Sequence, residues 1–532
     1  MKAHLALVPA VAGIMLASAT ACTSSTGDAS EDIIVGTTDQ VTASEEAPAP
    51  LDPAYAYDIS TWNVLRQTVQ TLMTQPRADT SPVPDAAKEC RFTDTNNRRY
   101  SCTLRDNLKF ASGDPITSDD VKFSIDRSIS IKADSGVFSL LSTVKAVETQ
   151  GKRTVIFHLN TPDATFPLKL TTPVAGIVNP SNYKPHSLRP GFGVDGSGPY
   201  TLSTESKDGS LTRATFRKNP HYIGAQEIRN TKAAIQFFPD TGSMNSALDS
   251  GEIDVSTRGM SPQRIASLAN SSAGEIRLYE SPGLEIRYLS FNTDASSVRN
   301  KAVRQAIAQI VDRGELASNV YDYQVDPLHS IVPTQVVTHT NSFFNKYGVP
   351  NNVKAKKLLS SAKISLPVRL KLHYTTDHYG PATKKEFEVL QKQLNTSGLF
   401  DVAIEGTPWK DFRPAEKSGA YDVYGMGWFP DFPDPDSFVA PFLDKDNTLN
   451  SSYVNREIRD VLLPESRREV DRFQASRSLT AIQKITAEDV PILPLWQGKQ
   501  YVAAREEITG AEYAVNSSAT LQLWELGIGL KA

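Results

Sequence analysis

Residues 100–127 read YSCTLRDNLKFASGDPITSDDVKFSIDR. The first residues alternate between apolar and polar, with Tyr100 and Leu104 on the same side, and this period of two is typical of a half-buried strand. The ASGDP stretch that follows is rich in turn-forming residues. Thr117 and Asp120 are then spaced as a capping box, which indicates the start of a helix. The stretch therefore predicts a strand, a turn and a helix in direct succession.

Strand-like and helical segments alternate along the rest of the chain. TVIFHL at 154–159 and IRYLSFNT at 286–293 have the composition of buried strands. The segment 298–316 carries an apolar stripe at helical spacing and predicts one long helix. KKEFEVLQKQLNTSG at 384–398 predicts another helix, ended by glycine. This alternation predicts a mixed α/β fold.

The chain has 532 residues and a formal net charge of −4. That length is enough for two to four domains by the usual prior. We see no large basic patch, so nucleic acid is not expected as a partner. The eight histidines are scattered, and His373 and His378 are the nearest couple. Neither a metal site nor a cofactor is therefore expected from ligand spacing.

The N-terminus has the layout of a secretory signal. Lys2 opens a short charged start, residues 5–21 are nearly all apolar or small, and a polar run follows Cys22. The stretch is short for a transmembrane helix. We predict a signal peptide over 1–21 and a flexible, lipidated tether over 22–32.

Cysteine usage agrees with a lipid anchor. ASATAC resembles a bacterial lipobox, in which the signal is cut before the cysteine that carries the lipid, although Ala19 stands where Leu is usual. Cys90 and Cys102 flank a turn-like TDTNN centre, and they predict a disulfide across a hairpin in an oxidising compartment. Cys22 is then the odd cysteine. The alternative is an ordinary cleaved signal, with Cys22 lost or left free.

A second informative stretch is GWFPDFPDPDSF at 427–438. Its prolines exclude a regular helix and stiffen the loop. We expect Asp434 and Asp436 to be turn residues whose side chains bond their own backbone. A calcium loop is excluded because D-x-x-D-x-D lacks the spacing, the glycine and the distal glutamate of an EF-hand.

Six motifs in order resemble the family 5 solute-binding proteins of ABC importers, which include oligopeptide-, dipeptide- and nickel-binding proteins. The motifs are LDPAYAYD, YSCTLRDNLKFASGDPITSDDVKFSIDR, GSGPYTL, LSFNT with VRQAIAQIVDR, GWFPDFPDPDSF and DVPILPL. The resemblance covers the chain from about residue 33 to its end.

The resemblance implies a two-lobed periplasmic-binding-protein clamshell of type II, in its three-domain peptide-binding variety. Ligand would bind between the lobes and be buried when they close. Lobe II would comprise 286–497, and an accessory domain of 63–174 would pack on lobe I. Lobe I would be discontinuous, formed by 33–62, 175–285 and 498–532.

The resemblance also implies a site. In peptide-binding members, the aspartate three residues after the loop tryptophan holds the α-ammonium of the ligand, and this position is Asp431, after Trp428. A rigid carboxylate suits an ammonium because the hydrogen bond is charge-assisted. The main chain from Gly427 to Phe429 would pair with the peptide as an added strand. Similar contacts on the other lobe are expected at Tyr57, Asp58 and Ile59.

The far end of the ligand has no matching anchor. Gly425 stands where some members carry an arginine, and 377–385 lacks the arginine of dipeptide binders. We expect Lys384 and Lys385 there to lie on an exposed helix face. Ligand identity and length therefore stay open, and the alternative is a non-peptide solute such as a metal chelate.

Two motifs that are typical of enzymes occur here, but each lacks the sequence context that its activity requires. GFGVDG at 191–196 has no strand before it and no helix after it, as dinucleotide binding requires. Ser360 with Lys363, the KSG at 417–419 and the YVN at 453–455 resemble parts of a penicillin-recognising serine hydrolase, but in the wrong order. The sequence therefore predicts a non-enzymatic, monomeric receptor, anchored to the outer face of the cell membrane, that passes peptides to an ABC permease.

Overall fold

The computed structural model describes residues 32–45, 47–77, 81–271, 274–445 and 447–529. The predicted signal peptide and Cys22 lie outside these residues. Within the described ranges no helix has the length and apolar character needed to cross a membrane.

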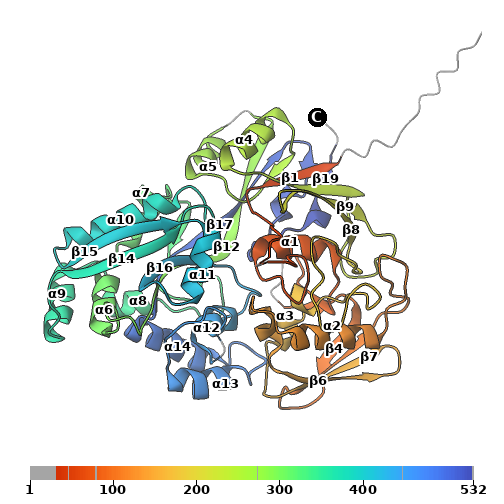
Figure 1. Cartoon of the computed structure of the whole chain (residues 1–532), viewed down its shortest axis with the longest axis horizontal. Coiled ribbons are helices and arrows are strands. Elements are labelled where there is room, and N and C mark those ends of the chain that lie inside the picture. The colour runs from red at the N-terminus through yellow and green to blue at the C-terminus, as the bar shows by residue number, and fades with distance from the viewer. Residues whose placement is uncertain (1–31, 46, 78–80, 272–273, 446, 530–532) are drawn as a thin grey trace, which may run out of the picture. The chain divides into compact units, whose positions relative to one another are not determined.

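Eleven strands form one mixed sheet (Figure 1). They are β1 (Ile33–Thr37), β8 (Tyr200–Lys207), β9 (Ser210–Lys218), β10 (Lys232–Phe237), β11 (Val255–Ser256), β12 (Ile276–Phe291), β13 (Val325–Pro327), β14 (Val368–Thr375), β15 (Phe400–Thr407), β16 (Val423–Trp428) and β17 (Ile492–Arg505). Their order is β15-β14-β16-β12-β17-β11-β1-β10-β9-β8, and β13 pairs with β17. The neighbours of β1 and β14 run parallel to them, and the other pairs are antiparallel.

The two longest strands, β12 and β17, connect the two ends of this sheet. β12 pairs with β16 through Ile286–Phe291 and with β17 along most of its length, and β17 pairs in turn with β11. The register between β12 and β17 shifts between Pro282 and Ile286. A Cβ on Gly283 would lie 2.6 Å from the carbonyl oxygen of Gly498. The two backbones therefore approach closely at the irregularity, which explains the glycine there.

A separate antiparallel sheet has the order β4-β5-β7-β6. Its strands are β4 (Ala87–Phe92), β5 (Arg99–Leu104), β6 (Val144–Gln150) and β7 (Thr154–Leu159). The strand, turn and helix predicted over 100–127 are confirmed, because β5 is followed by α2 (Ser118–Ile131). The carboxylate of Asp120 accepts the Thr117 amide at 2.7 Å, as a capping box requires.

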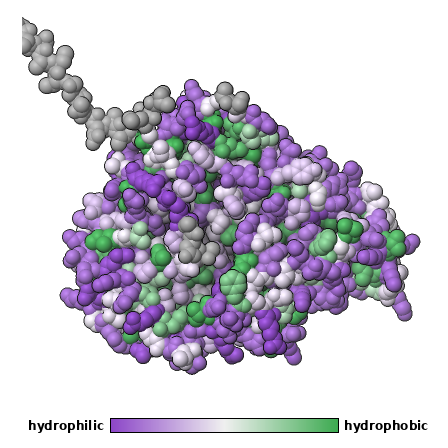
Figure 2. Space-filling view, turned by 180° about the vertical axis from the view of Figure 1, so that it is seen from behind, coloured by the Kyte–Doolittle hydropathy of each residue, from purple (hydrophilic) through white to green (hydrophobic). Residues whose placement is uncertain are grey.

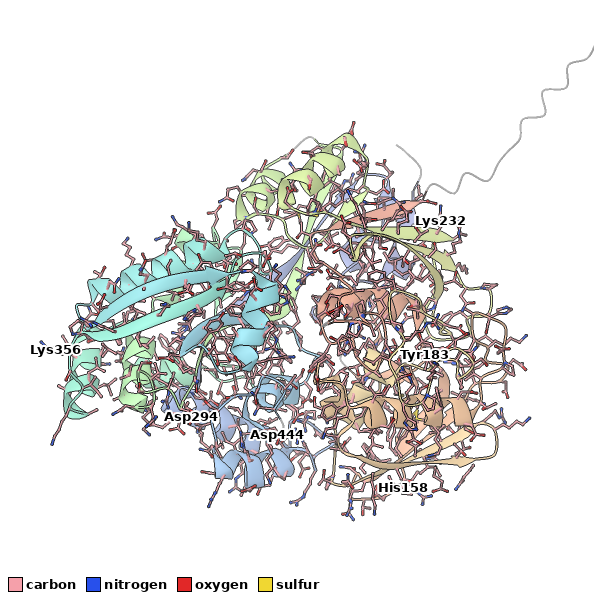
Figure 3. All side chains as sticks on the ribbon, in the orientation of Figure 1. His158, Tyr183, Lys232, Asp294, Lys356 and Asp444 are labelled. Carbon is pink, nitrogen blue, oxygen red and sulfur yellow. A yellow bond between two sulfur atoms is a disulfide. The ribbon has the colours of Figure 1, made fainter. Side chains whose placement is uncertain are left out.

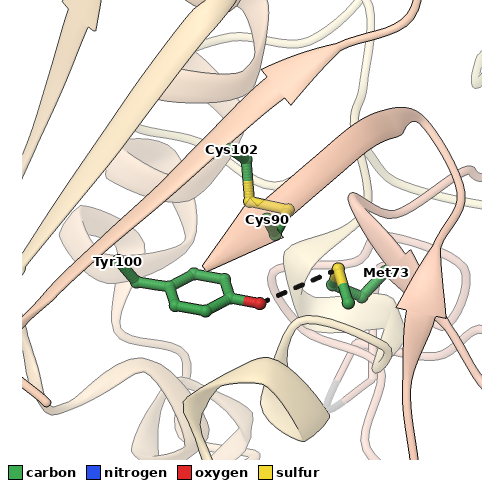
Figure 4. The surroundings of a disulfide bond; sticks show 4 residues. All are labelled: Met73, Cys90, Tyr100 and Cys102. Atoms are coloured by element: carbon green, nitrogen blue, oxygen red, sulfur yellow. Dashed lines mark hydrogen bonds between the residues drawn. A yellow bond between two sulfur atoms is a disulfide. The ribbon is translucent and has the colours of Figure 1, made fainter. Parts of the chain in front are cut away.

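The predicted disulfide lies in this sheet. Cys90 in β4 and Cys102 in β5 are register partners and are covalently joined (Figure 4). The hydroxyl of Tyr100 lies 4.0 Å from the sulfur of Met73 beside them. Cys22 is therefore the one cysteine of the three without a partner in this pair.

The remaining elements are helices and short strands. The α-helices are α1 (Ile59–Thr68), α3 (Phe166–Lys169), α4 (Thr241–Ser250), α5 (Pro262–Ala269), α6 (Lys301–Ile310), α7 (Arg313–Asn319), α8 (Ser342–Tyr347), α9 (Asn352–Ser361), α10 (Thr383–Thr396), α11 (Trp409–Lys417), α12 (Asp436–Leu443), α13 (Leu463–Ser466) and α14 (Ser476–Asp489). Short helical turns occur at Val137–Leu141, Pro173–Ala175, Ile458–Leu462, Ala511–Tyr513 and Leu523–Glu525, and short strands are β2 (Met73–Thr74), β3 (Val83–Pro84), β18 (Ile508–Thr509) and β19 (Gly527–Ile528).

The prediction of one helix over 298–316 is wrong. The structure has two helices there, because α6 ends at Ile310 and α7 begins at Arg313. The carboxylate of Asp312 accepts the amide of Glu315 at 3.1 Å and so caps a new helix.

Two of the sequence motifs are joined by a buried ion pair. Asp52 of LDPAYAYD binds both terminal nitrogens of Arg127 on α2, at 2.7 and 2.6 Å. The ring of Tyr183 lies 5.2 Å from the Arg127 guanidinium. In Figure 3, Tyr183 lies among the side chains around α2, whereas Lys356 on α9 lies at the periphery. The segment before α1 is thereby fixed to α2.

The apolar core has several parts. The largest buried cluster joins the four-stranded sheet to β1, α1 and the segment after β17, through residues such as Phe157, Phe166 and Leu523. Two further clusters pack on β14, β16 and their helices. On the face shown in Figure 2, exposed apolar residues lie in small separate groups. The division into two lobes and an accessory domain stays a prediction.

Candidate functional site

The loop after β16 is held in place by one serine of α12. The indole nitrogen of Trp428 donates to the carbonyl oxygen of Ser437 at 2.7 Å, and the amide of Asp431 donates to the hydroxyl of Ser437 at 2.8 Å. The tryptophan and the aspartate are therefore fixed to the same residue. This explains how a loop without regular structure can orient a carboxylate.

Tyr57 lies against this loop from the segment before α1. Its hydroxyl donates to Oδ2 of Asp431 at 3.2 Å. Its ring meets Trp428 edge-on, with the centroids 6.4 Å apart, and it also packs on Trp62 at 5.6 Å. The structure therefore brings together two predicted site residues that are 374 positions apart in the sequence.

Asp431 is a buried carboxyl group with an altered acidity. The residue is only 6% exposed. Burial raises its pKa to about 7, while the hydrogen bond from Tyr57 and the charges of Arg66 and Lys169 oppose this increase. Lys169 is already bound to Asp163 at 2.8 Å. Among the described residues, no Lys or Arg nitrogen lies within 4 Å of the Asp431 carboxylate.

The other two aspartates of the loop do have cationic partners. Asp434 accepts the amide of Asp436 at 2.8 Å, which confirms the predicted turn bond, but it also pairs with Arg472 at 2.6 Å. Asp436 lies in the first turn of α12 and pairs with Arg467 at 2.9 Å. Both are buried. Their interpretation as turn residues is therefore incomplete, because each also neutralises a buried arginine.

The lack of a side chain at Gly427 leaves room for the guanidinium of Arg287. It is the register partner of Arg287 in β12, and a Cβ at Gly427 would lie 2.1 Å from Nη1 of Arg287. The guanidinium stacks on Tyr379 at 3.7 Å, and the Tyr379 hydroxyl lies 3.4 Å from the carbonyl oxygen of Gly427. The register of β14 with β16 covers only Val423 and Tyr424. The later part of β16 is therefore not paired with β14.

Phe429, another predicted site residue of this loop, packs against a cationic side chain. The guanidinium of Arg258 lies 4.6 Å from the ring centroid, and Asp39 binds that arginine at 2.7 and 2.9 Å. Asp39 follows β1, so this contact again joins the beginning of the chain to the loop.

Asp58 and Ile59 are used in α1. Asp58 is the N-cap residue, and its carboxylate accepts the Thr61 amide and the Thr61 hydroxyl, both at 2.9 Å. Ile59 is the first residue of the helix and packs on the core. Among the described residues, neither side chain forms a hydrogen bond with Asp431. Their contact with a ligand stays a prediction.

The residues of the rejected enzyme motifs have other partners. Ser360 donates to the carbonyl oxygen of Lys357 at 3.1 Å, Lys417 to that of Asp134 at 3.4 Å, and Tyr453 to the carboxylate of Asp489 at 2.6 Å. These contacts lie on three different parts of the chain and do not form a catalytic arrangement.

The histidines and lysines also have structural surroundings. His373 stacks on Tyr421 at 4.1 Å, and His378 stacks on Trp409 at 3.9 Å. The described part of the chain contains no cluster of three or more His, Cys, Asp or Glu side chains suited to a metal ion. Lys384 and Lys385 are exposed on α10, as predicted.

Sequence reasoning missed Arg66, Arg258, Arg287 and Tyr379. Arg287 had a local signal, since a charged residue interrupts the apolar strand IRYLSF. Arg66 had none, because a polar residue on a helix usually faces water. Its charge influences Asp431 across segments that are distant in the sequence.

Comparison with known proteins identifies the family of the chain. Residues 81–450 match the family model described as bacterial extracellular solute-binding proteins, family 5 Middle. The probable D,D-dipeptide-binding periplasmic protein of Escherichia coli (strain K12) is 25% identical, over 87% of this chain and 89% of its own. The oligopeptide-binding protein of Bacillus subtilis (strain 168) is 25% identical, over 89% and 90%.

Solved structures share the fold. The murein tripeptide binding protein of Escherichia coli matches with a TM-score of 0.79 at 21% identity, over 93% of this chain and 98% of its own. The PBP AgaA from A. tumefaciens R10, in complex with agropinic acid, matches with a TM-score of 0.78 at 21% identity, over 94% and 99%. From the family model that covers most of its length, the chain belongs to the family 5 bacterial extracellular solute-binding proteins.

Proposed function

We propose that this chain is the peptide-binding receptor of an ABC importer. The observation that carries the proposal is the contrast among the three loop aspartates. Asp434 and Asp436 each have an arginine partner, whereas Asp431 is also buried but has no cation within 4 Å among the described residues. A buried carboxylate without a cation is costly. The ammonium group of a ligand would remove that cost.

The ligand would enter between two lobes. In the open state water solvates Asp431, and a peptide amine binds it weakly. Closure brings Tyr57 against the loop and removes water, which strengthens the ammonium–carboxylate pair. The Tyr57 hydroxyl then shares the carboxylate with the ligand. Recognition therefore depends on closure as well as on contact.

The peptide main chain would add to β16. The edge of β16 from Gly425 to Trp428 lies beyond the β14 pairing, and Phe429 follows it. Main-chain hydrogen bonds there are independent of the ligand's side chains. This supports a receptor that accepts many peptide sequences. The fold does not determine the solute, since AgaA shares the fold and is in complex with agropinic acid. The alternative ligand is a metal chelate or another non-peptide solute.

We place the receptor outside the cytoplasmic membrane. The family is described as extracellular, and we propose that a lipid on Cys22 anchors a monomer to the outer face of the membrane. The closed receptor would then deliver its peptide to the permease subunits.

The test is the affinity of Asp431→Asn for tripeptides. We expect the substitution to cost about 2–5 kcal/mol of binding free energy for Ala-Ala-Ala, the scale for losing one partner of a buried charge pair. Titration calorimetry would measure it on the full mature chain. N-acetyl-Ala-Ala-Ala is the matched control ligand, because it lacks the ammonium. Equal affinity of both proteins for Ala-Ala-Ala would remove Asp431 from the site.

A further inference from the structure

Arg258 contacts the proposed binding loop from a distant segment of the chain. It comes two residues after β11, and on the proposed division it belongs to lobe I, whereas Phe429 belongs to lobe II. The guanidinium lies 4.6 Å from the ring centroid of Phe429. Phe429 ends the stretch of main chain that we expect to pair with a peptide. A ligand that pairs with this stretch would therefore have Arg258 within its reach.

The ion pair of Arg258 leaves most of its donors free. Both carboxylate oxygens of Asp39 accept from Nε of the arginine, at 2.9 and 2.7 Å. Neither terminal nitrogen of Arg258 has a hydrogen-bond partner among the described residues, and neither is fully buried. Asp39 thus orients the guanidinium through Nε alone. The two terminal nitrogens form a planar fork whose geometry matches a carboxylate.

The other arginine beside the loop is already occupied. Nη2 of Arg287 pairs with Glu285 at 2.7 Å, and its Nη1 is fully buried next to Gly427. The guanidinium also stacks on Tyr379 at 3.7 Å. A ligand carboxylate would have to displace Glu285 to bind Arg287. Of these two arginines, Arg258 is therefore the one with donors available to a ligand.

A small cavity lies beside Arg258. Its volume is about 20 Å³, and its lining includes Arg258, Asp39, Ser60 and Asn63. This is room for one or two water-sized groups, since one needs roughly 10–15 Å³. Ser60 follows Ile59 in the first turn of α1, where ligand contacts are predicted. The guanidinium therefore borders open space next to a second predicted contact segment.

The loop fixes the spacing between two charged groups of a ligand. Asp431, the proposed partner of the ligand ammonium, follows Phe429 by two residues. Two residues of extended chain span at most about 7 Å. A peptide that runs along the loop therefore passes from Asp431 to Phe429 within about two of its own residues. The terminal carboxylate of a dipeptide has this separation from its ammonium, and so does an acidic side chain on a second residue.

We propose that Arg258 binds a carboxylate of the ligand that lies about two residues from its amino end. The inference rests on the proposed peptide function. The carboxylate accepts from both terminal nitrogens of Arg258, while Asp39 holds Nε. Each charge of the ligand then has a fixed partner, Asp431 for the ammonium and Arg258 for the carboxylate. Arg258 thus supplies from lobe I the anchor that is missing at Gly425 and in 377–385.

The test uses two pairs of ligands, measured by titration calorimetry on the mature chain. Ala-Ala is compared with Ala-Ala-amide, and Ala-Glu-Ala-amide with Ala-Gln-Ala-amide. The members of each pair have nearly the same size and differ by one negative charge. We expect the charged member of at least one pair to bind about tenfold to hundredfold more tightly, the scale of hydrogen bonds to a charged group. The pair that differs shows whether the carboxyl terminus or a side chain supplies the carboxylate.

Variants of Arg258 connect this preference to the residue. In Arg258→Gln the ratio within the pair should fall to about one. Arg258→Lys keeps the positive charge but loses the fork, so it should retain only part of the ratio, and it provides the measurement if Arg258→Gln does not fold. Arg277→Gln is the matched control, because it removes an arginine of β12 on the same proposed lobe whose side chain is 58% exposed. It should keep the full ratio.

Equal binding within both pairs of ligands to the wild-type chain would overturn the inference. A ratio that persists in Arg258→Gln, or is unchanged in Arg258→Lys, would do so as well, because the carboxylate would then bind elsewhere. Equal weakening of charged and uncharged ligands in Arg258→Gln would limit Arg258 to its contact with Phe429 and contradict the proposal. Failure of all four peptides to bind, each with a free amine, would instead reject the proposed function.

Discussion

At the scale of single residues, the acidity of Asp431 makes the proposed closure of the lobes depend on pH. The pKa of Asp431 is about 7, above the ordinary value of 3.8, because burial disfavours the charged form. A raised carboxyl pKa destabilises the closed form as pH rises from about 4 to about 7. In the proposed open state water solvates Asp431, so acid favours closure without a ligand, whereas neutral pH favours the open form.

We therefore expect acid to favour the closed form of the ligand-free chain. Small-angle X-ray scattering should give a smaller radius of gyration at about pH 4.5 than at about pH 7.5, because protonation removes the cost of burying the Asp431 carboxylate. Asp431→Asn has no titrating group at this position, and its radius should change little over this range. Equal wild-type radii at the two pH values would contradict the assigned acidity.

At the scale of elements, the Asp52–Arg127 pair holds the segment before α1 on α2. Both side chains are at most 1% exposed. Removing one partner leaves a buried charge, so we expect Asp52→Ala to lower the free energy of unfolding by about 3–5 kcal/mol. Urea denaturation would measure it. Asp106→Ala is the matched control, because its pair with Arg153 is exposed and should contribute less than about 1 kcal/mol. Similar losses in both variants would contradict the argument.

Patterns among residues close in sequence predicted helices, strands and the disulfide well. They did not predict which side chains from distant segments would pair. The strand, turn and helix over 100–127 and the Cys90–Cys102 disulfide depend on residues close in sequence, and they are confirmed. Asp312 could have indicated the break between α6 and α7, because aspartate is a common N-cap residue. The apolar stripe continues across this position and led to the prediction of one helix. The arginine partners of Asp434 and Asp436 lie more than 30 positions away and depend on packing between helices.

The candidate site divides in the same way. Asp431 and Trp428 were proposed through the family resemblance, and the structure brings them to Tyr57. Asp58 was proposed in the same way; its side chain caps α1, and its contact with a ligand stays a prediction. Arg66 was not identified, because neither periodicity nor spacing shows which charged residue of a helix will influence a distant carboxyl group.

At the scale of the whole molecule, contacts beside the site join segments that the proposed lobes would separate on opening. Asn97 donates its side-chain amide to the carbonyl oxygen of Arg468 at 2.7 Å, and the Ala164 amide donates to that of Arg467 at 2.8 Å. On the proposed division into lobes, these bonds would form only in the closed state. They should therefore slow the release of ligand more than they speed its capture.

The test is Asn97→Gly, since Asn97 has a φ of +52° and glycine adopts that conformation without strain. We expect a dissociation rate about threefold to tenfold higher for a bound tripeptide, the scale of one lost hydrogen bond. Stopped-flow fluorescence would measure both rates. Arg369→Gln is the control, because it removes an arginine whose side chain is 88% exposed, and it should leave both rates unchanged. An unchanged dissociation rate would exclude this contact from closure.

The course of β17 through the sheet has a consequence for the order in which the protein is made. β1 pairs with β10 and β11, all from the first half of the chain, whereas the pairs that β11 and β12 make with β17 need a strand that ends at Arg505. Synthesis proceeds from the N-terminus, so the central pairing of the sheet cannot form until almost the whole chain has emerged. Such distant pairing is slow to form. The pairs with β17 are thus the last of the sheet to form, and a chain that is exported as we propose would cross the membrane before they are complete.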